Sequence, residues 1–285
     1  MADFMISFLI CNLWISVIAG IILAVRRFFY RYLTNRAKYR LWFLLLGCCI
    51  VPLLPLPAMR LSQLSDLFRL FLSPAAPANP ITAEQAALVR ASGAAGWLQD
   101  FSVTVSAKTP SGIWQALCFV WIAGIGVMAV SMLLPTLRFY RIRQSALPLQ
   151  NAAVRGVYQR CLEEMRVKKE LPVYSTAFLT SPVIAGLFRQ GIYLPIFVVS
   201  DYPAGKVRYM LLHELAHYKH KDTFVQMLMK LARMIYWFHP LVCYALSEMH
   251  TDREAACDAS VLELLCEDAY ADYGNTLLDL AQHTS

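Results

Sequence analysis

Long apolar runs alternate with short basic clusters over the first half of the chain. The runs cover residues 4–25, 41–59 and 113–134, and none of them contains a charged residue. A helix needs about 20 apolar residues to cross the hydrocarbon core of a bilayer, which is roughly 30 Å thick. The pattern therefore predicts three transmembrane helices in a membrane domain that covers residues 1–135.

The basic clusters orient these helices. Residues 26–40 hold six cations and no acid, and Arg138, Arg141 and Arg143 follow the third run. Since cytoplasmic loops carry an excess of Lys and Arg, both clusters are expected in the cytoplasm. The N-terminus and an extracellular loop at 60–112 then lie outside, and the chain after residue 135 lies inside. A cleaved signal peptide is the alternative for the first run, and it is disfavoured because the charges follow the run.

The extracellular loop at 60–112 is rich in small residues and prolines, as in the stretch SPAAPANP. It is expected to be a partly ordered connection. Residues 61–72 within it have helical periodicity and fit a helix that lies along the outer membrane surface. No function is predicted for this loop.

The pattern changes after residue 135. Residues 152–169 have the spacing of an amphipathic helix that ends before Pro172. The runs VYSTAF, PVIAGLF and GIYLP are short, β-branched or aromatic, and separated by Pro and Gly, so they predict a small antiparallel sheet. From Lys206 the pattern is helical again. The predicted fold is mainly α, with multi-span membrane helices and a cytoplasmic α+β domain over residues 136–285.

Composition and charge support the membrane class. The chain is 58% hydrophobic and only 16% charged, which is more apolar than a soluble domain can hide. The net charge of +7 comes from cations beside apolar runs, so it indicates membrane orientation and anionic lipid contact, and direct nucleic acid binding is excluded. The eight cysteines form no CxxC pair, a pattern typical of free thiols in a reducing compartment.

The motif HELAH at residues 213–217 is the main candidate for chemistry. Residues four apart on a helix share one face, so His213 and His217 can offer two imidazole nitrogens to one Zn²⁺. Glu214 projects beside the metal, where it can act as catalytic base on a water whose pKa zinc lowers toward roughly 7. A solvated helix that happens to hold two histidines is the alternative. The apolar flanks of the motif disfavour it because buried histidines need partners.

A third ligand is predicted downstream, in the stretch TDREAACDAS. Glu254 and Asp258 are four residues apart, so Glu254 can bind the metal while Asp258 orients a ligand histidine from behind. The alternative is an exposed acidic helix face. Asp222 is expected to hold the end of the motif helix.

Other polar residues are weaker candidates. We expect His220 to be solvated, His239 to be structural, Cys257 to be a buried inert thiol, and His250 to be a weaker candidate for binding substrate. A donor for the developing oxyanion stays open among Tyr270, Tyr273 and His283. The apolar residues 224–246 could form a fourth span, but His217 and Glu254 must share one metal. A hydrophobic hairpin, or a helix against the membrane or within the catalytic domain, is therefore favoured.

The motifs HELAHYKHKD and YWFHPLVCYALSEMHTDREAACD, on a three-span scaffold, resemble the BlaR/MecR family of bacterial membrane zinc metallopeptidases. This family comprises β-lactam-sensing antirepressor transducers and their relatives. The resemblance implies a gluzincin-type protease in the bacterial cell membrane, with zinc held by His213, His217 and Glu254, and Glu214 as base. It also implies cleavage of the protease itself and of a cytoplasmic repressor. Partners are thus the lipid bilayer and that repressor, and a homo-oligomer is left open.

The chain departs from the family in one respect. Family receptors continue into an extracellular penicillin-binding sensor domain, whereas this chain ends at Ser285. The chain has no S-x-x-K or KTG motif of such a domain. The most similar stretch, SAKTP at 106–110, has the wrong spacing. β-Lactam sensing is therefore not predicted. Two functions are carried forward: a membrane-embedded zinc endopeptidase of a signal-transduction system, and a proteolytically incomplete membrane signalling or scaffold fragment. An assigned oxyanion donor would favour the endopeptidase over the incomplete fragment.

Overall fold

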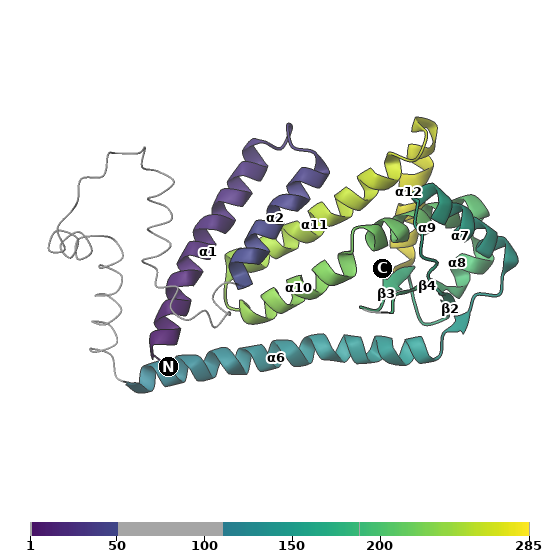
Figure 1. Cartoon of the computed structure of the whole chain (residues 1–285). Coiled ribbons are helices and arrows are strands. Elements are labelled where there is room, and N and C mark those ends of the chain that lie inside the picture. Colours follow the sequence, from purple (N-terminus) through teal and green to yellow (C-terminus); the bar gives the residue numbers. More distant parts are fainter. Residues whose placement is uncertain (1, 51–110, 188, 285) are drawn as a thin grey trace. The chain divides into compact units, whose positions relative to one another are not determined.

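The computed structural model describes residues 2–50, 111–187 and 189–284, and the fold is mainly helical (Figure 1). The chain divides into two compact units. One comprises Met1–Ile18 and Gly47–Gly124, and the other comprises Ala19–Leu46 and Ile125–Ser285. The candidate chemistry predicted from the sequence lies entirely in the second unit.

Two helices are long and apolar enough to cross a membrane. They are Phe8–Phe28, within α1 (Ala2–Phe28), and Gly112–Gln144, within α6 (Ser111–Gln144). Helix α6 continues through Pro135 for about three turns beyond the predicted end of the third run. Helix α2 (Asn35–Ile50) includes the start of the second run, whose residues 51–59 lie outside the described residues. Nearly all of the predicted loop at 60–112, including the helix predicted at 61–72, also lies outside them.

The remaining helices follow residue 150. They are α7 (Ala152–Met165), α8 (Ile196–Asp201), α9 (Ala204–Lys219), α10 (Asp222–Ile235), α11 (Pro240–Leu262), the short 3₁₀ helix η2 (Glu267–Ala269) and α12 (Tyr270–Thr284). Helix α7 begins where the Asn151 side chain accepts hydrogen bonds from two backbone N–H groups. It ends at Arg166, whose φ of 54° is left-handed. This conformation stops the helix before the predicted end at residue 169.

A small mixed sheet accompanies these helices. It contains β1 (Leu147–Pro148), β2 (Val173–Thr176), β3 (Val183–Ala185) and β4 (Gly191–Pro195), in the order β1-β2-β4-β3. The β1–β2 and β3–β4 pairs are antiparallel, as predicted, but β2 and β4 are parallel, so an entirely antiparallel sheet is wrong.

The reason for the parallel pair lies in β4. All five of its residues are buried, and it takes a central position with a partner on each side. The chain must therefore pass from β2 to the far edge of the sheet, form β3, and return as β4. Gly186 makes that return feasible: its φ is 106°, and a Cβ there would lie 2.2 Å from the carbonyl oxygen of Arg189.

Helix α9 lies at the centre of the core. Its residues Leu211, Leu212, Leu215 and Ala216 are fully buried, and it packs against α7, α11 and α12. Burial of a leucine side chain contributes about 1.5–3 kcal/mol, so this helix is firmly held. The HELAH motif thus lies on the helix at the centre of this core.

The apolar stretch at 224–246 is divided between two helices. Helix α10 ends at Ile235, and α11 begins at Pro240 after a turn. The His239 ring caps α11 by accepting a hydrogen bond from the Val242 N–H at 3.2 Å, which agrees with the structural role expected for it. Helices α10 and α11 run side by side (Figure 1), so the stretch is a helical hairpin. Contact of this hairpin with lipid stays a prediction.

Candidate metal centre

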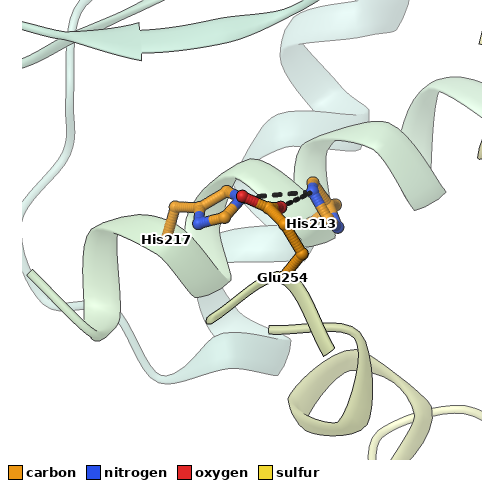
Figure 2. Close-up of side chains that lie close together, drawn as sticks. All are labelled: His213, His217 and Glu254. Carbon is orange, nitrogen blue, oxygen red and sulfur yellow. Dashed lines mark hydrogen bonds and ion pairs between the residues drawn. The ribbon is translucent and has the colours of Figure 1, made fainter. Parts of the chain in front are cut away.

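Three side chains from two helices converge on one point (Figure 2). His213 and His217 project from α9, and Glu254 projects from α11. The two Nε2 atoms lie 3.1 Å apart, and the Glu254 Oε2 atom lies 3.3 Å from His217 Nε2 and 3.8 Å from His213 Nε2. Ligands at about 2.0–2.1 Å around a tetrahedral Zn²⁺ lie about 3.3 Å from one another. The triangle of donor atoms therefore has the size that a zinc ion requires.

The outer nitrogen of each histidine is held by a carboxylate. His217 Nδ1 lies 2.7 Å from Asp222 Oδ2, and His213 Nδ1 lies 3.1 Å from Asp258 Oδ1. The Tyr273 hydroxyl donates to Asp258 at 2.7 Å and lies 3.1 Å from His213 Nδ1. These partners favour a proton on each Nδ1 and leave both Nε2 lone pairs facing the triangle, which is the tautomer that binds a metal.

The charges around the triangle favour a cation at its centre. Burial alone would raise the pKa of Glu254, but hydrogen bonds from His217 and Arg253 outweigh it and lower the pKa to about 2. Burial would also raise the pKa of Asp258, but hydrogen bonds from His213 and Tyr273 outweigh this effect and lower it. Although burial disfavours the charged His217 ring, its hydrogen bonds to Asp222, Cys257 and Glu254 raise its pKa overall. The site thus accommodates positive charge, whether a proton or a metal ion.

Glu214 lies beside the triangle and is linked to the sheet. Its Oε2 atom accepts a hydrogen bond from the backbone N–H of Ile184 at 3.0 Å. Burial raises the pKa of Glu214, while the two histidines and the Ile184 N–H oppose this rise. A carboxylate whose pKa moves toward neutrality is better matched to accepting and returning a proton. This is the property that a general base needs.

Cys257 and Asp222 form a second cluster with His217, behind the triangle. The Cys257 Sγ atom lies 3.1 Å from Asp222 Oδ2 and 3.2 Å from His217 Nδ1. These are hydrogen-bond separations. Burial raises the pKa of the Cys257 thiol to about 11, so the sulfur is protonated at neutral pH. We interpret this cluster as support for His217, because a metal would need the thiolate.

Two sequence expectations for nearby residues are revised. His220 was expected in solvent, yet it is only partly exposed and lies 3.4 Å from Cys257 Sγ and 3.2 Å from Ser260 Oγ. Tyr273 was one candidate for the oxyanion donor, but its hydroxyl lies on the outer side of His213 and is engaged by Asp258. The His250 side chain is 60% exposed, beside Arg253 and Glu254.

Sequence reasoning missed the supporting roles of three residues at this centre. Arg253 is buried and donates to Glu254 Oε1 at 2.5 Å. Tyr273 supports His213, and Tyr39 donates a hydrogen bond to Asp222. The position of Arg253 next to a carboxylate ligand could have signalled its role. The two tyrosines are 15 and 183 residues from the carboxylates that they contact, and no spacing rule indicates such pairs.

A match to a known family implies a class of protein, a metallopeptidase-type hydrolase, and the structure adds two candidate membrane helices. A model of the BlaR1 peptidase M56 family matches residues 7–285, and the chain belongs to that family. The resemblance inferred from HELAHYKHKD and the downstream motif is therefore confirmed.

Individual relatives agree with the family match. The regulatory protein BlaR1 of Bacillus licheniformis is 27% identical over 288 residues, which cover 100% of this chain and 47% of that protein. The methicillin resistance mecR1 protein of Staphylococcus aureus is 24% identical over 277 residues, which cover 95% of this chain and 46% of that protein. The chain thus spans less than half the length of these curated relatives.

Proposed function

We propose that the chain is a membrane-embedded zinc metalloendopeptidase of the gluzincin type. The observation that carries this proposal is the triangle of His213, His217 and Glu254 donor atoms, with separations of 3.1, 3.3 and 3.8 Å. Two imidazole nitrogens and one carboxylate oxygen are borderline-hard donors that suit Zn²⁺. Three protein ligands also leave a fourth position for water, as in catalytic rather than structural zinc sites.

Zinc, when bound, supplies a Lewis acid that lowers the pKa of a water molecule and polarises the scissile carbonyl. The chain's own residues do the remaining work. Glu214 accepts the proton of the attacking water and returns it to the leaving amine. Asp222 and Asp258 keep the two ligand imidazoles in the tautomer that offers Nε2. Arg253 keeps Glu254 ionised and in place.

The edge strand β3 is the proposed binding place for the substrate backbone. Strand β3 pairs with β4 on one side, and the Ile184 N–H points away from β4 to Glu214. An extended peptide that adds to this edge would pass directly beside the general base. Recognition through backbone hydrogen bonds fits an endopeptidase that cleaves within a chain.

The proposed substrates are the protease itself and a cytoplasmic transcriptional repressor. Relatives named as a regulatory protein and a methicillin resistance protein support a role in signal transduction. The proposed location is the bacterial cell membrane, with three spans, the N-terminus outside and residues 136–285 in the cytoplasm. The basic residues after the first and third apolar runs support this orientation.

A second candidate is a membrane signalling or scaffold fragment that lacks proteolytic activity. It is favoured by the engagement of the Tyr273 hydroxyl with Asp258, which leaves the oxyanion donor unassigned. Both candidates would bind zinc at the same site, and only the endopeptidase would cleave peptide bonds.

The test is peptide-bond cleavage by the full chain in detergent. A β-casein digest and self-cleavage would be followed for the wild type, Glu214→Gln and the control Glu163→Gln, which changes an exposed carboxylate on α7. We expect the wild type and Glu163→Gln to cleave, and Glu214→Gln to lose at least about 100-fold in kcat while keeping its zinc. Equal cleavage by Glu214→Gln and the wild type would contradict the peptidase proposal. Zinc binding without any cleavage in the wild type would favour the scaffold.

A further inference from the structure

The carboxylate behind His217 bridges two parts of the chain that are far apart in sequence. Asp222 is 1% exposed and binds His217 Nδ1 with its Oδ2 atom at 2.7 Å. Its other oxygen, Oδ1, accepts a hydrogen bond from the hydroxyl of Tyr39 at 3.2 Å. Tyr39 is itself buried and lies on α2, more than 180 residues earlier. A line of contacts thus runs from α2 through Asp222 to a proposed zinc ligand.

The position of Tyr39 is fixed by a set of polar contacts around it. One turn further along α2, the Trp42 Nε1–H donates to Asp252 at 2.8 Å, and both residues are buried. Arg26, at the end of α1, donates to the same Asp252 at 2.8 Å and pairs with Glu248. Residues three apart lie on one face of a helix, so Tyr39 and Trp42 present a single face of α2.

A further contact lies one turn earlier on α2. Arg36 pairs with Glu263 at 2.5 Å and donates to Ser260 at 3.2 Å, both near the end of α11. Tyr39 is therefore flanked on both sides by contacts to α11, the helix that carries Glu254. Little freedom remains for its hydroxyl to move away from Asp222.

The Tyr39 hydroxyl matters because Asp222 is a buried carboxylate with two oxygens to satisfy. A buried carboxylate needs a hydrogen bond on each oxygen, because an unsatisfied polar atom in a low-dielectric interior is costly. The Cys257 thiol and the His217 ring approach Oδ2, while Tyr39 serves Oδ1. Without the hydroxyl, Oδ1 would have to turn toward another donor, and Oδ2 would lose its alignment with His217. Groups that orient a ligand histidine typically alter metal affinity 10–100-fold when removed.

We propose that Tyr39 is a positioning residue of the metal centre, acting on His217 through Asp222. The segment at 19–46 then completes a site whose ligands all come from residues 213–254. This inference rests on the proposed zinc site, and it adds to that site a support from outside the domain at 136–285.

The test compares zinc affinity in the full chain purified in detergent. Tyr39→Phe keeps the ring and removes only the hydroxyl, and Tyr32→Phe is the matched control because Tyr32 is 85% exposed. Affinity would be measured by competition with a chromophoric chelator. We expect Tyr39→Phe to bind zinc about 3–10-fold more weakly than the wild type, and Tyr32→Phe to bind it equally well.

A double-mutant cycle separates positioning from general stability. Asp222→Asn should weaken zinc binding about 10–100-fold, and adding Tyr39→Phe to it should change the affinity little further. Thermal unfolding with and without zinc gives a second readout. A positioning role reduces the rise in unfolding temperature that zinc produces, whereas a merely structural role lowers both temperatures equally.

The outcomes distinguish this inference from the proposed function. A wild type that binds zinc, with Tyr39→Phe equal to Tyr32→Phe in affinity, would overturn the role of Tyr39 and leave the zinc site intact. A folded wild type without zinc affinity would overturn both. Weakened binding in Tyr39→Phe supports the inference even if no peptide is cleaved.

Discussion

The two ligand histidines are supported in different ways. Behind His213, Asp258 and Tyr273 both belong to the C-terminal helices, and the hydroxyl contacts the ring and the carboxylate together. Behind His217, Asp222 depends on Tyr39 from α2. One half of the centre is thus completed within residues 204–284, and the other half reaches into the N-terminal helices. The comparison shows that a short metal-binding motif can depend on residues that are distant from it in the sequence.

The largest expected effect comes from Arg253, which lies between the two halves. It is buried, pairs with Glu254 at 2.5 Å and lies 3.9 Å from Asp222. Arg253→Ala removes a buried guanidinium from Glu254, whose side chain is 36% exposed, and from the vicinity of the buried Asp222. A hydrogen bond to a charged group contributes about 1.5–3 kcal/mol. We expect a much lower unfolding temperature, measured in detergent by intrinsic fluorescence. The exposed Arg27→Ala is the control, and an equal effect of both changes would show that the Arg253 pair is unimportant.

The next largest effect is on zinc binding, and it distinguishes the carboxylates behind the two ligand histidines. Asp222→Asn is expected to weaken zinc binding about 10–100-fold, and Asp258→Asn less, because Tyr273 still contacts His213. Chelator competition on both variants measures the difference. A larger loss in Asp258→Asn would reverse the comparison between the halves.

A smaller effect is expected from Tyr273→Phe. If the hydroxyl supports Asp258, zinc affinity should fall about 3–10-fold, while cleavage at saturating zinc stays near the wild-type rate. If Tyr273 instead stabilised the oxyanion, kcat would fall about 100-fold or more with zinc still bound. Parallel measurements of zinc affinity and of kcat decide between these roles.

The smallest effect is a pH dependence of the metal-free chain. The folded pKa of Glu254 is about 2, below the usual value for Glu of about 4.3. A lowered folded pKa means that its contribution to stability is complete above about pH 4.3 and is lost as the pH falls toward 2. The unfolding temperature should therefore drop in this range, and less so in Glu254→Gln. Identical profiles would show that Glu254 contributes nothing to this drop.

Local pattern predicts much of this molecule. Apolar runs locate α1 and α6, and the four-residue spacing of His213 and His217 places both on one face of α9. The Glu254 and Asp258 spacing likewise places both carboxylates on one face of α11, with one at the triangle and one behind His213. The apolar runs are recognised by their length and hydropathy, and the two residue pairs by their four-residue spacing. Each feature therefore depends only on residues within a single helix.

Other features depend on contacts between distant segments, and the sequence does not encode them in any short spacing. The parallel pairing of β2 with β4 follows from the buried position of β4 in the finished sheet. The pairing of Tyr39 with Asp222 depends on how α2 lies against α10 and α11. Arg166 ends α7 in a left-handed conformation, which is uncommon for arginine and cannot be predicted from its residue type.

The central claim is that His213, His217 and Glu254 hold one zinc ion. Its most direct test is elemental analysis of the detergent-purified chain, beside His213→Ala, Glu254→Ala and the exposed-carboxylate control Glu163→Ala. We expect about one zinc per chain in the wild type and the control, and almost none in the two ligand variants. A folded wild type without zinc, or full zinc content in Glu254→Ala, would contradict the three-ligand site.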